Sequence, residues 1–176
     1  MSGPEILVLT TGGTIDKTYF DGVGRYQFDG SKIPDLIKIA RVTRPFHVID
    51  LMRKDSFDLD DTDRSAIIAA VREAKTPHIV ITHGTDTMPR TAEVLAAEGV
   101  AKTVVLVGSF LPARFADSDA AFNLGMAFAT AQMAEPGVYI AMNGAVFRAG
   151  EVIKDRALGT FRGVDRASLG SVEHRS

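Results

Sequence analysis

The alternation of short apolar runs with segments of helical periodicity is the feature that most constrains how this chain folds. Each apolar run is too short for a typical helix and ends in glycine, hydroxyl or acidic residues, as buried strands do. Between the runs, apolar residues recur at the spacing of a helix with one buried face. Strands that alternate with helices form parallel sheets. We therefore predict an α/β fold, an open, mainly parallel three-layer sheet with helices on both faces.

Local signals give the expected elements. Asp60 to Asp63 place capping side chains and negative charge where a helix begins, and Gly99 suits the position after a helix end. A hairpin is expected over residues 146–154, turning at Ala149-Gly150, and a loop or hairpin over residues 16–29. The strands are predicted over residues 5–10, 46–52, 78–82, 104–107 and 138–142. The helices are predicted over residues 33–40, 60–74, 87–98 and 119–133.

Two strand ends carry the polar residues that indicate a site. The apolar run before Thr82 stops in His83-Gly84-Thr85-Asp86-Thr87, and the run before Thr10 stops in Thr11-Gly12-Gly13-Thr14. Both have the order strand, glycine-containing turn, hydroxyl. Because the carboxyl ends of parallel strands lie along one edge of a sheet, where ligands bind, we expect the two turns to form one site.

Composition excludes several classes of function. The chain has 176 residues, enough for one domain with a sizeable core, and its net charge of −2 lacks the basic excess of a nucleic-acid-binding surface. The absence of cysteine excludes disulfides, thiol catalysis and Cys-ligated zinc. No apolar run approaches the ~20 residues of a membrane span, and we recognise no signal peptide. We expect a cytoplasmic protein without nucleic-acid or membrane partners.

Each candidate residue has an ordinary structural role beside the chemical one. The turn at Gly12-Gly13 could bind phosphate through its N–H groups, but neither a dinucleotide fingerprint nor a P-loop is present. Thr14 could serve as a nucleophile, although a hydroxyl needs an activating base, or it could cap the following segment. Asp86 could bind an ammonium group or cap the next helix.

Two further residues extend the candidate site. His83 invites the role of a base, but a histidine at a strand end commonly bonds to buried polar groups instead. Lys154 is by default a solvated surface residue. It would act as a base only if it were held beside a hydroxyl and away from water, because removal from water favours the neutral amine.

The chain resembles the bacterial-type L-asparaginases. That family has two signatures, Thr-Gly-Gly-Thr-Ile and His-Gly-Thr-Asp-Thr, and both are present here in order, as residues 11–15 and 83–87. The likeness continues through residues 107–109, 118–124 and 142–154 and covers the chain to about residue 160. Two signatures on matching elements are far more specific than either alone.

The resemblance implies a role for each matching residue. Thr14 matches the primary nucleophilic threonine, and Thr85 matches the second catalytic threonine, which forms a hydrogen-bonded group with Lys154 and Asp86. Asp86 also matches the residue that binds the α-ammonium group of the substrate. The expected substrate contacts are Gly13, Asp55, Ser56, Gly84, Thr85 and Asp86.

The family also has a tyrosine on a flexible loop, which orients the first threonine. Tyr19 and Tyr26 are both candidates, and we favour Tyr19 because Gly22 and Gly24 follow it. This loop would close over the substrate as a lid and exclude water. Backbone N–H groups would stabilise the oxyanion, and the reaction needs neither a metal nor another cofactor.

The usual family member carries a second, C-terminal domain that completes the active site of a neighbouring subunit. This sequence resembles a short member whose residues 1–176 form a single catalytic domain. An apolar face left open by the second domain would favour self-association into a dimer or tetramer.

The leading hypothesis is an L-asparagine amidohydrolase that produces L-aspartate and ammonia with a threonine nucleophile. Glutamine is the nearest alternative substrate, because one methylene changes binding by only about 1–3 kcal/mol. Two other classes of function stay open. One is a catalytically weak module that binds an amino acid, and the other is an asparaginase-like subunit of a tRNA-dependent amidotransferase.

Overall fold

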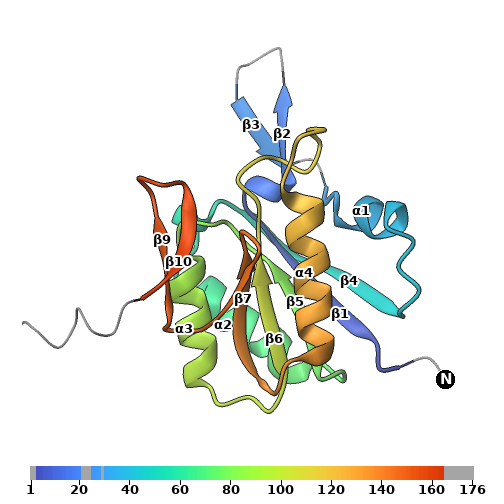
Figure 1. The fold of residues 1–176 in the computed structure, drawn as a ribbon. Helices are drawn as coiled ribbons and strands as arrows, with labels where there is room; N and C mark the ends of the chain where they lie inside the picture. Colours follow the sequence, from blue (N-terminus) through green and yellow to red (C-terminus); the bar gives the residue numbers. More distant parts are fainter. Residues whose placement is uncertain (1–2, 21–24, 29, 165–176) are drawn as a thin grey trace, which may run out of the picture.

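The computed structural model describes residues 3–20, 25–28 and 30–164. Its centre is a six-stranded sheet in the order β4-β1-β5-β6-β7-β8 (Figure 1). The first five strands in that order are parallel, and β8 runs antiparallel to β7. The strands are β1 (Ile6–Gly12), β4 (Phe46–Lys54), β5 (His78–Thr82), β6 (Thr103–Val107), β7 (Gly137–Met142) and β8 (Ala145–Arg148). The predicted α/β sheet is confirmed.

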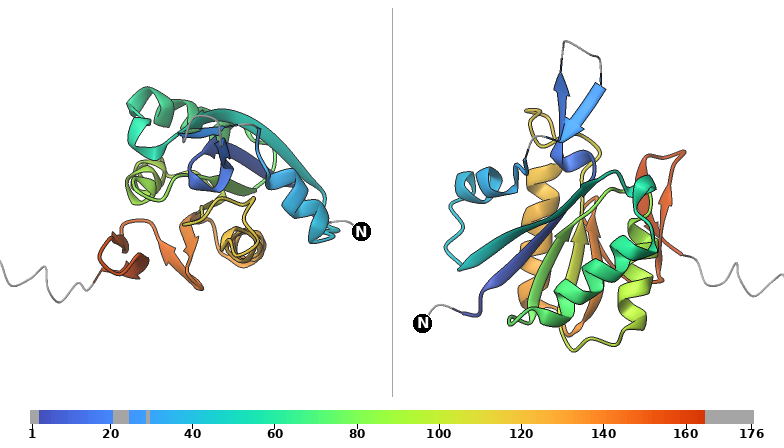
Figure 2. Two further views of the ribbon diagram at one scale, coloured as in Figure 1. Left: turned by 90° about the horizontal axis from the view of Figure 1, so that it is seen from above. Right: turned by 180° about the vertical axis from the view of Figure 1, so that it is seen from behind.

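Helices cover both faces of this sheet (Figure 2). Alternate residues of β1 enter different cores: Leu7 packs into the cluster that contains side chains of α2 and α3, whereas Val8 packs into the cluster of α1 and α4. A central strand buried on both faces needs apolar residues at nearly every position, which explains its continuous apolar run. The helices are α1 (Ile33–Ile39), α2 (Asp61–Glu73), α3 (Met88–Ala97) and α4 (Ala120–Met133).

The predicted helix signals operate in the structure. Asp60 caps α2 in a reciprocal arrangement, in which its side chain accepts from the N–H of Asp63 and the side chain of Asp63 accepts from the N–H of Asp60. Gly99 follows α3 with a φ of +60°, which an L side chain rarely adopts. At the start of α1, Lys32 occupies the cap position, and the Ser31 hydroxyl before it accepts from the N–H of Ile33.

The strand order creates a natural place for a ligand. From β1 the chain reaches β4 on one side of it by way of α1, and from β4 it crosses to β5 on the other side by way of α2. The connections after β1 and β4 therefore diverge onto opposite faces of the sheet. In open α/β sheets, ligands bind in the crevice at this point, outside the carboxyl ends of the strands.

The region after β1 is a hairpin, one of the two predicted possibilities. A short helical turn, η1 (Thr14–Asp16), leads into β2 (Lys17–Phe20), which pairs antiparallel with β3 (Arg25–Phe28). The hairpin projects beyond the end of the sheet where β1 ends (Figure 1). It thus lies beside the connections that were predicted to form the site.

The predicted hairpin over residues 146–154 is wrong. β8 pairs with β7 across the turn Asn143-Gly144, while β9 (Val152–Asp155) pairs with β10 (Thr160–Gly163) in a separate two-stranded sheet. Both turn residues have positive φ, +54° and +75°. Asn-Gly favours this geometry, so β8 is taken up by β7 before the chain reaches the turn at Gly150, where it leaves the main sheet. The strand over residues 160–163 was not predicted.

Candidate active site

The connections after β1, β4 and β5 touch one another. A Cβ atom at Gly13 would lie 2.4 Å from the Gly84 nitrogen, and a Cβ atom at Gly84 would lie 2.6 Å from the Ser56 Cβ. Only glycine permits such close contact at positions 13 and 84, and Gly13 also has a φ of +80°, which L side chains rarely adopt. The two glycine-containing turns, distant in sequence, therefore meet at the switch point of the sheet, as the sequence predicted.

Thr14 follows this contact directly. It is the first residue of η1, and Gly13, which has no side chain, occupies the cap position. The turn is fastened by the N–H of Gly13, which donates to the Lys54 carbonyl at 2.9 Å, and by the carbonyl of Ile15, which accepts from Ala113 at 3.0 Å. Thr14 is half-buried. Because Gly13 holds the cap position, the alternative in which Thr14 caps the segment does not describe this turn.

Thr85, Asp86 and Lys154 form a bonded group at the end of β5. The Lys154 Nζ donates to the Thr85 Oγ1 and to the Asp86 Oδ1, both at 2.8 Å. The side chain of Lys154 is 15% exposed and lies 5.5 Å from the centre of the Phe110 ring. Thr87 occupies the cap position of α3, so Asp86 does not cap that helix. Lys154 thus lies against a hydroxyl and is largely removed from water.

The short helical turn η2 (Ser56–Asp58) lies against Gly84. Ser56 is 1% exposed, and its Oγ has no hydrogen-bond partner among the described residues. A buried hydroxyl without a partner is costly in a folded protein, and a bound ligand can supply the missing bond. The Thr87 hydroxyl donates to the Ser56 carbonyl at 2.7 Å and holds this turn to the start of α3.

Asp55 lies between this turn and the hairpin. Its carboxylate accepts from Lys17 of β2 and from the N–H of Phe57. Burial raises the pKa of the Asp55 carboxyl, but the bonds from Lys17 and Phe57 outweigh burial and hold the pKa below its usual value. Asp55 therefore contributes a paired carboxylate that joins η2 to the hairpin.

His83 does not offer a base to the site. Its side chain is fully buried, and both ring nitrogens lie within hydrogen-bond distance of protein atoms. Burial lowers the pKa of His83 to about 4. This agrees with the expectation that the histidine bonds to buried polar groups.

Sequence reasoning missed Asp16, which lies at the base of the hairpin. It is 4% exposed and accepts from the Ser31 hydroxyl at 2.9 Å and from the N–H of Lys32 at 3.2 Å. Burial raises the pKa of Asp16 to about 6, against the lowering effect of these two bonds. The carboxyl therefore ties together the two ends of the segment that follows Thr14.

The two candidate tyrosines face each other in the hairpin. Tyr19 of β2 and Tyr26 of β3 are register partners, but their side chains lie outside the part of the chain that the structure describes. Both residues stay candidates for the tyrosine that orients Thr14.

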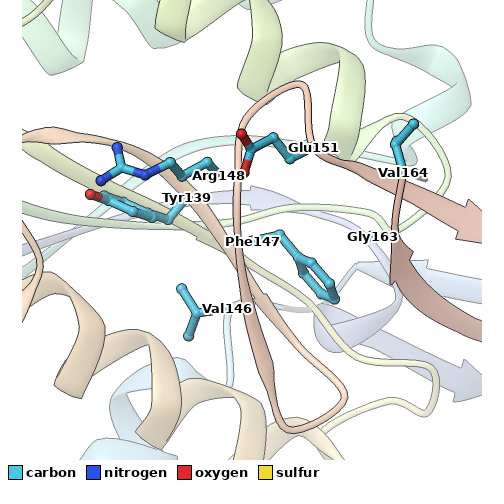
Figure 3. Close-up of a pocket in the computed structure, with 7 residues that line it drawn as sticks. All are labelled: Tyr139, Val146, Phe147, Arg148, Glu151, Gly163 and Val164. Carbon is cyan, nitrogen blue, oxygen red and sulfur yellow. The ribbon is translucent and has the colours of Figure 1, made fainter. Parts of the chain in front are cut away.

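Two hollows of the surface differ in the predicted site residues that line them. The hollow beside β8, about 670 Å³, is lined by Tyr139, Arg148 and their neighbours and contains none of the predicted site residues (Figure 3). A hollow of about 360 Å³ is lined by Asp86, Lys154 and Arg156, among others. The second hollow adjoins Asp86 and Lys154 of the bonded group, and its other lining residues belong to α3, to β9 and to the segments beside them.

Two kinds of feature are absent from the described part of the chain. In residues 3–20, 25–28 and 30–164, no group of three or more histidine, aspartate or glutamate side chains is arranged to bind a metal ion. No helix within those ranges has the length and apolar character required to cross a membrane.

Comparisons with known proteins agree with the geometry. A family model described as "Asparaginase, N-terminal" matches residues 5–176. L-asparaginase of Thermococcus kodakarensis is 34% identical over 165 residues, which cover 88% of this chain and 49% of that protein. The solved structure of the thermostable L-asparaginase from that organism superposes with a TM-score of 0.81 at 32% identity, covering 91% of this chain and 51% of the other.

Two further relatives are an asparaginase and a subunit of a different enzyme. L-asparaginase 2 of Escherichia coli is 32% identical over 188 residues, covering 97% of this chain and 53% of that protein. One subunit of the glutamyl-tRNA(Gln) amidotransferase of Methanopyrus kandleri is 32% identical over 152 residues, covering 80% of this chain and 33% of that protein. The chain spans about half the length of the two L-asparaginases.

Proposed function

This chain belongs to the asparaginase family, and from that membership we propose that it hydrolyses the side-chain amide of L-asparagine to L-aspartate and ammonia. The observation that carries the proposal is the contact between the Gly13 and Gly84 turns. Thr14 and Thr85 follow the two glycines directly, which supports the proposal that both hydroxyls act on one substrate. A hydroxyl bonded to a lysine that also pairs with a carboxylate, as Thr85 is, suits attack on an amide.

In the proposed reaction, the Thr14 hydroxyl oxygen adds to the amide carbon. The hydroxyl proton passes to the amide nitrogen, which leaves as ammonia, and an ester with Thr14 remains. Water then hydrolyses the ester, which releases L-aspartate and restores the hydroxyl. Thr85, held by Lys154 at 2.8 Å, orients the reacting groups. Backbone N–H groups of the two turns stabilise the negative oxygen of each tetrahedral intermediate.

The α-amino-acid end of the substrate needs partners of its own. Asp86 carries a carboxylate suited to the α-ammonium group, and its side chain is 24% exposed. The buried Ser56 hydroxyl, which has no partner among the described residues, offers a hydrogen bond to the same end of the substrate. Tyr19, on the hairpin, orients Thr14 in this proposal.

A coupled ammonia assay tests the proposal. The purified chain is given L-asparagine and L-glutamine side by side, and Thr14→Val and Thr85→Val are assayed with it. Valine keeps the shape of threonine, and we expect each change to reduce kcat by about 100-fold or more. Thr130→Val on α4 is the matched control and should retain full activity. Near-normal turnover in both active-site variants would contradict the assignment.

The relative from Methanopyrus kandleri favours a second candidate, an ammonia-producing subunit of an amidotransferase. Such a subunit depends on a partner protein, so the isolated chain would release little ammonia from either amino acid. A module that only binds would be stabilised by L-aspartate without any turnover. The same assay, combined with thermal unfolding in L-aspartate, separates the three functions.

We also propose that residues 1–176 form a single catalytic domain. We propose further that this domain associates with itself as a dimer or tetramer. The outer surface of α4 supports association, because Phe122 is 65% exposed and Met133 is 84% exposed. Light scattering of the purified chain over a range of concentrations tests it. A monomer at every concentration would contradict it.

A further inference from the structure

His83 is buried where β5 ends, and its two ring nitrogens have different partners. Nδ1 lies 2.7 Å from the carbonyl oxygen of Gly84, and Nε2 lies 2.9 Å from the hydroxyl oxygen of Thr91 on α3. The proposed reaction uses neither nitrogen. The imidazole nevertheless bonds to the peptide group that joins Gly84 to Thr85.

A buried arginine completes this chain of bonds. Arg64 of α2 is 4% exposed, and its Nε donates to the Thr91 hydroxyl oxygen at 3.3 Å. The Gly84 carbonyl can only accept, so Nδ1 carries the single proton of the neutral ring and donates it to Gly84. Nε2 then accepts from the Thr91 hydroxyl, whose oxygen in turn accepts from the guanidinium group of Arg64. Burial and the charge of Arg64 keep the ring neutral by lowering its pKa to about 4.

The bond to Gly84 fixes a peptide plane in the candidate site. No described peptide bond is cis, and in a trans peptide the carbonyl and the following N–H point in opposite directions. With the Gly84 carbonyl held toward His83, the N–H of Thr85 points away from the imidazole. The opposite rotation of this plane would reverse both groups. The three side chains thus determine where the Thr85 N–H points.

We propose that Arg64, Thr91 and His83 are positioning residues, which act in series to fix the Gly84–Thr85 peptide and thereby the N–H and hydroxyl of Thr85 for amide hydrolysis. This inference rests on the proposed function. These hydrogen bonds connect α2 and α3 to the Gly84 carbonyl, and none of the three side chains contacts the substrate in the proposed reaction. Its effect is on the orientation of Thr85, so its loss reduces kcat more than it changes KM.

The first test needs no variant and no turnover. Nitrogen-15 NMR of the histidine rings in the wild-type chain reports which ring nitrogen of His83 carries the proton. We expect Nδ1 protonated and Nε2 unprotonated between about pH 6 and 8. A proton on Nε2, or a doubly protonated ring in that range, would overturn the inference.

The second test exchanges Thr91. Thr91→Val keeps the shape and removes the hydroxyl, whereas Thr91→Ser keeps the hydroxyl. We expect Thr91→Val to lower kcat about 10- to 100-fold with KM within about twofold, the size of effect that misorientation produces, and Thr91→Ser to recover most of the rate. Thr130→Val is the control for the same exchange on another helix. A folded Thr91→Val with wild-type kcat would overturn the inference.

A binding measurement separates failure of the inference from failure of the proposed function. The Thr85 amide signal is followed while L-aspartate is added to each variant. We expect the signal to move to saturation in the wild-type chain and in Thr91→Ser, and to move less in Thr91→Val. A wild-type chain that binds L-aspartate but releases no ammonia contradicts the proposed function alone. An identical Thr85 response in all three proteins contradicts the positioning role.

Discussion

The Lys154 Nζ lies 2.8 Å from the Thr85 Oγ1, although 69 positions of sequence separate the two residues. The contact arises because the chain leaves the main sheet after β8, and β9 then packs against α3, the helix that follows Thr85. The departure of β9 at Gly150, which the sequence did not predict, is therefore what brings the lysine to the hydroxyl.

Two replacements of Lys154 should show whether turnover depends on the charge of its side chain or on the packing of its apolar part. Lys154→Met keeps the apolar length of the side chain but removes the donor to Thr85 and Asp86, and we expect kcat for L-asparagine to fall about 100-fold or more. Lys154→Arg should keep the ion pair to Asp86 and retain part of the rate. The measurement is steady-state ammonia release, with exposed Lys38→Met as the control. Equal rates in Lys154→Met and the wild-type chain would remove this lysine from the mechanism.

The contact at Gly84 predicts a steric effect. In Gly84→Ala, the new methyl group would lie 2.6 Å from the Ser56 Cβ and 2.9 Å from the Ser56 nitrogen. Two connections must then move apart, and we expect a loss of about 1–3 kcal/mol in unfolding free energy together with loss of turnover. Urea denaturation provides the measurement.

Gly125 provides the matched control for this exchange. It lies in α4, and nothing is within 4 Å of an added Cβ. Gly125→Ala should stabilise the chain by up to about 1 kcal/mol because alanine favours the helix. If both alanine variants changed stability by the same amount, the close approach at Gly84 would not be the cause.

Asp16 should make stability depend on pH. Its pKa is raised to about 6 in the folded chain, from 3.8. Between these values the folded chain binds more protons than the unfolded chain, so this contribution to stability is complete below about pH 4 and is lost as the pH rises through about 6. The shift corresponds to about 3 kcal/mol at most. Asp16→Asn should therefore stabilise the chain more at pH 7 than at pH 4 in urea denaturation, and an equal change at both pH values would contradict this.

His83 acts in the opposite direction over nearly the same range. Its folded pKa, about 4, lies below the unfolded value of 6.5, so the unfolded chain takes up the proton first and stability is lost as the pH falls between these values. The two contributions partly cancel in the wild-type chain. In Asp16→Asn the decline toward acid pH should therefore be steeper than in the wild-type chain.

The sequence predicted the centre of the sheet because β1, β5, β6 and β7 are buried on both faces and are consequently largely apolar. The run His78 to Thr82 was predicted with its observed bounds, and the start of α2 followed from Asp60 and Asp63. The order of pairing was harder to predict. The turns at Asn143-Gly144 and Ala149-Gly150 both contain a glycine, and the first closes a hairpin because Asn-Gly favours its positive φ values and because β7 pairs with β8 in the sheet.

The candidate site could be proposed from the sequence where a strand end carries hydroxyl and acidic residues after a glycine, as at Thr14 and Thr85. It was not predictable where an ordinary residue acquires a role through burial. In the sequence, Arg64 is one of several charged residues on a predicted helix, and Thr91 is an uncharged residue of the next predicted helix. Their contact with each other and with His83 arises only when α2 and α3 pack together. Asp16 is similar, because the bonds that bury it come from a segment 15 positions away.

The parallel pairing of β1 with β5 has a consequence for how activity is acquired. The Thr11 hydroxyl donates to the Thr82 carbonyl at 2.7 Å, although 71 positions of sequence separate the two residues. The turns after β1 and β5 therefore come together only when these two strands pair. Helices can appear early during refolding, while distant strand pairs form slowly. Recovery of turnover after dilution from urea should therefore lag behind the return of helical circular dichroism, and it would report the moment at which the centre of the sheet closes.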